Sequence, residues 1–167
     1  MDLSALLVLQ RYNDYANRLV LDSADLLSQN DLALLSSPSH GSVLGLLQHM
    51  LGTEVYFLLE CQGLPPAPDT DEVSSLERLK ELYYQVSRQR EEYLQNATEE
   101  EMQELIRVKI GSGMVDLPRW QYLAQSLLAS IHHRGELSIV MTGLGQPLPT
   151  LDPIIEFVKE SGQEWPD

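Results

Sequence analysis

The chain has 167 residues, the length of one ordinary domain with a hydrophobic core, and we expect a single domain over residues 1–167. Its 11 basic and 25 acidic residues give a formal net charge of −14. Nucleic acids and anionic membrane surfaces are therefore not expected as partners, because both are bound largely through Lys and Arg. The single cysteine, Cys61, excludes an intramolecular disulfide framework. The N-terminus lacks a basic signal-peptide region and no apolar run is long enough to span a bilayer, so we expect a cytoplasmic protein.

The first predicted element is a helix over about residues 3–28, where apolar residues recur at three- and four-residue spacing without Gly or Pro. Asn13 and Asn17 lie four residues apart on one face of it, and we expect a solvent-exposed pair. Loop and capping residues follow over 31–42. His40 lies among them, and we expect a surface histidine without a role.

Residues 43 to about 60 are predicted to form the second long helix, with Ser39 or Ser42 as its cap. His49 lies beside its apolar stripe, where a lone histidine is more often a hydrogen-bonded core residue than a ligand. Cys61 ends this helix next to Glu60 rather than a basic residue. It therefore suits a small apolar filler better than a reactive thiol.

A Pro-rich linker over 62–75 cannot continue the helix and is long enough to cross from one end of a bundle to the other. A third long helix is expected over about 76–95. Residues 98–101 match a capping box, with Thr at the cap and Glu three residues later. The alternation of apolar and basic residues over 105–110, a Gly-Ser-Gly turn and a returning segment at 114–117 predict a small β-hairpin.

The last long helix is expected over 118–142, capped by Asp116, and a short helix follows over 153–159. Four long helices with one long crossover predict an all-α protein with the architecture of a four-helix bundle. The expected core positions of the last long helix are Trp120, Leu123, Leu127, Leu128, Ile131, Leu137 and Val140.

Three short motifs occur in order along these helices. Residues 12–17 are Tyr-Asn-Asp-Tyr-Ala-Asn, residues 47–50 are Leu-Gln-His-Met with Glu54 following, and residues 132–137 are His-His-Arg-Gly-Glu-Leu. In this order and spacing the motifs resemble those of the DinB/YfiT-like superfamily of proposed metalloenzymes. The last motif is similar to that family's His-His-Arg-Gly-Gln-Leu signature, and the first to its Tyr-Asn-x-Trp-x-Asn. The resemblance extends over nearly the whole chain and implies the four-helix bundle independently.

The resemblance also implies a metal ion held by three histidines, one from the second long helix and two from the last as His-x-x-x-His. The corresponding positions are His49, 129 and His133, but position 129 is Ala129. Glu136 lies three residues after His133 on nearly the same face, which gives the hypothesis of a Zn or Ni site on His49, His133 and Glu136. The alternative is that the metal has been lost, because two imidazoles alone hold a divalent ion weakly.

Two classes of function follow from the resemblance. As an enzyme, the protein would carry out metal-dependent thiol-transferase or hydrolase chemistry on a small molecule, with the ion activating a thiol or water. As a non-enzyme, it would be a bundle that binds a small molecule or serves as a dimeric structural protein. Family members are often homodimers, so a homodimer is expected in both cases. Arg134 is expected to form a structural salt bridge, and no catalytic residue is assigned.

Overall fold

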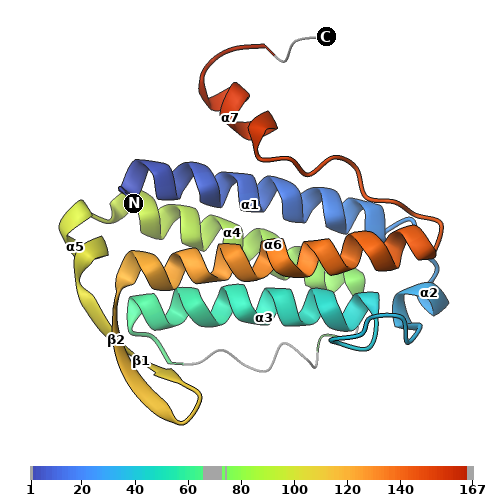
Figure 1. The fold of residues 1–167 in the computed structure, drawn as a ribbon, viewed down its shortest axis with the longest axis horizontal. Coiled ribbons are helices and arrows are strands. Elements are labelled where there is room, and N and C mark those ends of the chain that lie inside the picture. The colour runs from blue at the N-terminus through green and yellow to red at the C-terminus, as the bar shows by residue number, and fades with distance from the viewer. Residues whose placement is uncertain (1, 66–72, 74, 165–167) are drawn as a thin grey trace.

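The computed structural model describes residues 2–65, 73 and 75–164. Four long helices lie side by side as a bundle (Figure 1): α1 (Leu3–Ala24), α3 (Val43–Gln62), α4 (Leu76–Asn96) and α6 (Arg119–Gly143). The predicted all-α bundle is thus confirmed. The predicted crossover between α3 and α4 lies largely outside the described residues.

Three short helices and two strands complete the fold of the described residues. Helix α2 (Gln29–Ala33) precedes α3, α5 (Glu99–Gln103) follows α4, and α7 (Ile154–Glu160) lies beside α1. Strands β1 (Leu105–Ile110) and β2 (Gly113–Pro118) form the predicted antiparallel hairpin before α6, as Figure 1 shows.

Capping side chains fix most of the helix starts. Ser28 accepts a hydrogen bond from the backbone N–H of Asp31 and caps α2. The first helix ends before this cap, at Ala24, rather than extending to residue 28. Both bonds of the predicted capping box between Thr98 and Glu101 are present. The predicted Asp116 cap is wrong, because Asp116 pairs with Arg107 in the hairpin and α6 begins after Pro118 without a side-chain cap.

The core lies between the four long helices. Helix α6 packs against α1 and α3, so one side of it faces solvent. The predicted burial of Leu128 and Ile131 is therefore wrong: they are 58% and 41% exposed on that side. No helix in the described part of the chain combines the length and apolar composition needed to cross a membrane. The fully buried apolar side chains include Leu6, Leu46, Leu51, Leu79, Leu123, Leu137 and Met141.

Candidate functional site

Three histidine rings meet where α3, α6 and the loop before α3 come together. His49 on α3 and His133 on α6, far apart in sequence, have ring centres 4.8 Å apart and nearly perpendicular planes. The ring of His40 stacks on His49 at 3.8 Å and lies 5.2 Å from His133. His40, expected as a surface histidine without a role, is instead half-buried and packs against the other two rings.

Backbone geometry brings the loop that carries His40 against α3. Gly41 adopts φ of +79°, a conformation that favours glycine, and Ser37 and Gly41 form a bridge across the loop. At Gly45, in the first turn of α3, a side-chain carbon would overlap the carbonyl oxygen of His40. Glycine at position 45 thus lets the loop pack closely on the helix.

Glu136 ties the same loop to α6. Its carboxylate accepts hydrogen bonds from Ser37 Oγ at 2.5 Å, Ser39 Oγ at 2.6 Å and Ser39 N at 3.2 Å. Burial opposes ionisation, but these hydrogen bonds outweigh it and lower the pKa of Glu136 to about 2. Ser39 Oγ also lies 2.7 Å from His40 Nδ1. The carboxylate therefore holds the loop segment on which His40 lies.

Two other positions of interest on α6, Ala129 and His132, both precede His133. Ala129 is half-buried one turn before it, and its methyl group supplies no ligand. His132 is exposed, with its ring centre 5.2 Å from that of His133. Ala129 thus occupies the position at which the resemblance implies a histidine.

The electrostatics around His133 favour a neutral imidazole. Burial lowers its pKa, and the nearby rings of His49 and His40 lower it further, because each disfavours a second positive charge. Its Nδ1 atom is buried without a hydrogen-bond partner in the described structure. A neutral imidazole with an unpaired nitrogen is the form in which histidine binds a metal.

The three rings fit a metal centre in donor type and in two of their three spacings. Imidazoles on one tetrahedral ion, with Zn–N bonds of about 2.0 Å, have ring centres about 5 Å apart. The separations of 5.2 and 4.8 Å that involve His133 match this value, whereas the 3.8 Å between His40 and His49 is too short. As the side chains stand, no three His, Cys, Asp or Glu groups among the described residues are arranged to hold an ion. Binding would require the stacked rings to part by about an ångström.

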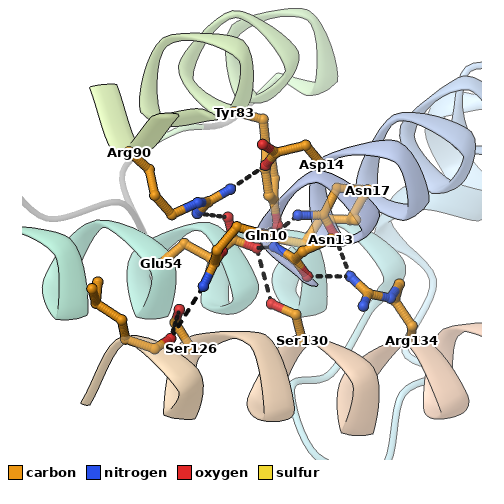
Figure 2. Close-up of polar contacts among 12 residues, drawn as sticks. Gln10, Asn13, Asp14, Asn17, Glu54, Tyr83, Arg90, Ser126, Ser130 and Arg134 are labelled. Atoms are coloured by element: carbon orange, nitrogen blue, oxygen red, sulfur yellow. Dashed lines mark hydrogen bonds and ion pairs between the residues drawn. The ribbon is translucent and has the colours of Figure 1, made fainter. Parts of the chain in front are cut away.

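A buried polar network joins α1, α3, α4 and α6 (Figure 2). Glu54 of α3 is 2% exposed, and one carboxylate oxygen accepts hydrogen bonds from Asn13 Nδ2 (2.8 Å), Asn17 Nδ2 (2.6 Å) and Ser130 Oγ (2.9 Å). The other oxygen accepts one from Arg90 Nη1 at 2.7 Å. Burial raises the pKa of Glu54, but Arg90 and the hydrogen bonds outweigh it, so the pKa is lowered and the group is ionised.

The two asparagines also connect this network to Arg134 of α6. Arg134 Nη1 donates to the Oδ1 atoms of Asn13 and Asn17, each at 2.7 Å (Figure 2). The predicted solvent-exposed asparagine pair is therefore wrong, since the residues are 0% and 5% exposed. The salt bridge expected for Arg134 is also wrong, because Arg134 donates hydrogen bonds to two amide oxygens rather than to a carboxylate. The network fixes the rotation of α6 at the residue next to His133.

Arg90 completes the network on α4. It is 1% exposed and pairs with Asp14 of α1 as well as with Glu54. Two cations, Arg90 and Arg134, thus face two carboxylates across the core, and the charges balance. Such buried charges require partners. The sequence feature that could have indicated this network is the set of polar residues inside otherwise apolar helical stripes.

Cys61 does not belong to either cluster. It is fully buried in α3, and burial raises the pKa of its thiol to about 12. This is consistent with the expected role as apolar filler, because a nucleophilic cysteine has a lowered pKa.

The comparisons with known proteins agree with the motifs and the fold. The sequence model described as "DinB family" matches residues 1–163. The chain belongs to the DinB family. A DinB-like protein from Bacillus cereus ATCC 10987 is similar in structure, with a TM-score of 0.63, 21% identity, and coverage of 81% of this chain and 90% of that one. A DinB-like protein from Bacillus subtilis gives a TM-score of 0.61, 15% identity, and coverage of 86% and 97%. At these identities the DinB-like structures support the fold alone. No curated protein matches significantly.

Proposed function

We propose that this DinB-family protein binds one divalent cation, Zn²⁺ or Ni²⁺, through His40, His49 and His133. The observation that carries the proposal is the closeness of the three rings, none more than 5.2 Å from another. His49 and His133 are two of the three ligands in the hypothesis from sequence, and Glu136 is the third. His40 takes the place of the third, because Glu136 directs its carboxylate to Ser37 and Ser39 of the loop.

The surrounding residues have supporting roles in this proposal. Ser39 Oγ, next to His40 Nδ1, orients that ring and leaves Nε2 for the ion. Glu136 anchors the loop and so positions His40. The network of Arg134 with the two asparagines holds α6 in register and presents the neutral His133 imidazole. Each is a positioning residue rather than a ligand.

The class of reaction that such a site suits is transfer or hydrolysis on a small molecule. A bound divalent ion lowers the pKa of a coordinated thiol or water and polarises the electrophile. Three protein ligands leave coordination positions open, which distinguishes catalytic from structural metal sites. The candidate activity is therefore that of a metal-dependent thiol transferase or hydrolase.

The alternative function is a bundle that has lost its metal and binds a small molecule or a second copy of itself. Ala129 and the stacking of His40 on His49 favour this alternative. A homodimer is compatible with both functions. It is supported by the exposed apolar side chains of Leu128, Ile131 and Ile139 on α6, the last 77% exposed. Light scattering during gel filtration tests it by giving the mass of the assembly.

A measurement of metal binding distinguishes the metal-dependent enzyme from the bundle that has lost its metal. Untagged protein, stripped with chelator and dialysed against Zn²⁺ or Ni²⁺, should retain about one ion per chain by elemental analysis. His133→Ala should abolish retention, whereas His132→Ala, an exposed neighbour, should not. Absence of metal in the parent protein, or equal retention by both variants, would reject the metal centre.

A further inference from the structure

A cavity of about 620 Å³ lies between α3, α6 and the β-hairpin. Its walls come from Tyr56 and Phe57 on α3, Tyr122 on α6, and Ile110 and Leu117 on the hairpin. Its volume falls in the range of roughly 300–1,000 Å³ that small-molecule sites occupy. None of the residues proposed to hold the cation lines it.

Three aromatic rings give the cavity an apolar wall. Phe57 and Tyr122 have ring centres 4.4 Å apart, and Tyr56 lies 5.5 Å from Phe57 and 6.4 Å from Tyr122, all edge to face. Tyr122 is 3% exposed, so its ring is fixed, whereas Tyr56 is 38% exposed at the opening. Burial first, and then a hydrogen bond with Tyr56, raise the pKa of Tyr122, so its hydroxyl stays neutral. Such a wall suits a planar apolar group.

A single charged side chain, Lys109, lines this cavity, together with the amides of Gln121 and Gln125. In the described part of the chain Lys109 forms no ion pair. The chain has a net charge of −14, so a lysine left without a carboxylate beside an apolar cavity is an unusual placement. It supplies a partner for an anionic group on a bound molecule.

The cavity lies on the same sides of α3 and α6 as the imidazoles. Tyr56 follows His49 by two helical turns, and Tyr122 precedes His133 by three. At 1.5 Å per residue these separations are about 10 Å along α3 and about 16 Å along α6. A molecule of ordinary metabolite length can therefore match the distance between the cavity and the cluster, and the small side chain of Ala129 lies between the two levels on α6.

We infer that this cavity binds a planar aromatic molecule with an anionic group, held by the ring wall and Lys109. The further statement that this molecule is the substrate of the histidine site rests on the proposed function. Binding in the cavity itself does not require the cation.

The first test uses metal-free, ¹⁵N-labelled protein and the probe 2-naphthoate, with neutral 2-naphthylmethanol for comparison. Saturable chemical-shift changes should fall on cavity-lining amides, and Lys109→Gln should weaken naphthoate binding about threefold while leaving the alcohol unaffected. Arg107→Gln, on the same strand but outside the cavity, is the matched control. Scattered or absent shifts, or equal naphthoate affinity of both variants, would overturn the cavity assignment.

A second arm tests the link to the histidine site. Protein loaded with paramagnetic Co²⁺ should broaden the proton signals of bound naphthoate relative to Zn²⁺-loaded protein, because the separations along the helices are about 10–16 Å. Retention of Co²⁺ without broadening would overturn the substrate assignment alone. If no metal is retained, the proposed function and the substrate assignment fail together. The titration of metal-free protein still tests whether the cavity binds the aromatic anion.

Discussion

His40 stacks on His49 with ring centres 3.8 Å apart and an interplanar angle of 23°, although one residue lies on a loop and the other in α3. The contact depends on how closely the loop approaches the helix, and it brings a third imidazole to the pair formed by His49 and His133. The position on α6 that the family uses for this imidazole holds Ala129. In the proposed site, a ligand from a loop would take the place of a ligand from a helix within the same bundle.

Gly45→Ala tests the placement of the loop. The new methyl group would overlap the carbonyl oxygen of His40, so the loop must shift and metal affinity should fall at least tenfold. Gly135→Ala on α6 is the control, because nothing lies within 4 Å of a side-chain carbon there. It should leave affinity unchanged and stabilise the protein by about 0.5–1 kcal/mol, since Ala favours a helix over Gly. Isothermal titration with Zn²⁺ makes both measurements of affinity. Equal affinities of the two variants would show that the loop does not matter.

Ala129→His restores the family's His-x-x-x-His pair on α6. The added imidazole lies one turn from His133 on the same face, so affinity for Zn²⁺ should rise further above a parent value that is already measurable. Competition with a chromophoric chelator measures both proteins. A parent that binds nothing beside a variant that binds tightly would mean that the native site is degenerate.

Glu54→Gln tests the buried network. It leaves Arg90 without the buried one of its two carboxylate partners, and the free energy of unfolding should fall by about 3–5 kcal/mol. Urea denaturation followed by circular dichroism measures this change. Glu92→Gln on the exposed side of α4 should change it by less than about 0.5 kcal/mol. A Glu54→Gln variant as stable as Glu92→Gln would contradict the network.

Glu136→Gln tests the loop anchor through pH. In the folded protein the pKa of Glu136 is about 2, below its ordinary value of 4.5. Its stabilisation is therefore fully present above about pH 4.5 and is lost as the pH falls toward 2. The parent should be more stable than the variant by on the order of 1 kcal/mol at pH 7, because the carboxylate is only partly buried. The difference should shrink between pH 4.5 and 3 in urea denaturation. A difference that does not depend on pH would exclude the carboxylate as its source.

Most of the fold could be predicted from local sequence patterns. Helical spacing, the Thr98 capping box and the alternation over 105–110 correspond to elements of the structure, because each depends on neighbours in sequence. The errors lie where tertiary contacts decide. Asn13 and Asn17 are buried because Glu54 and Arg134 reach them from two other helices, and Leu128 is exposed because no helix covers that side of α6.

The candidate site likewise combines residues that local motifs indicate with a residue, His40, whose place depends on tertiary contacts. The family motifs indicated His49 and His133 because helical ligands keep a fixed spacing. His40 has no such spacing, and its place depends on Gly45 and on the bonds between Glu136 and the loop serines. One available signal was missed: a glycine in the first turn of α3, five residues after a histidine, marks a close backbone contact there.

X-ray absorption spectroscopy at the Zn edge of untagged, Zn²⁺-loaded protein tests the metal centre most directly. The proposed site predicts three imidazole nitrogens at about 2.0 Å in the parent and two in His40→Ala. A parent that holds no zinc, or whose zinc has the same number of imidazole ligands with and without His40, would contradict the three-histidine centre.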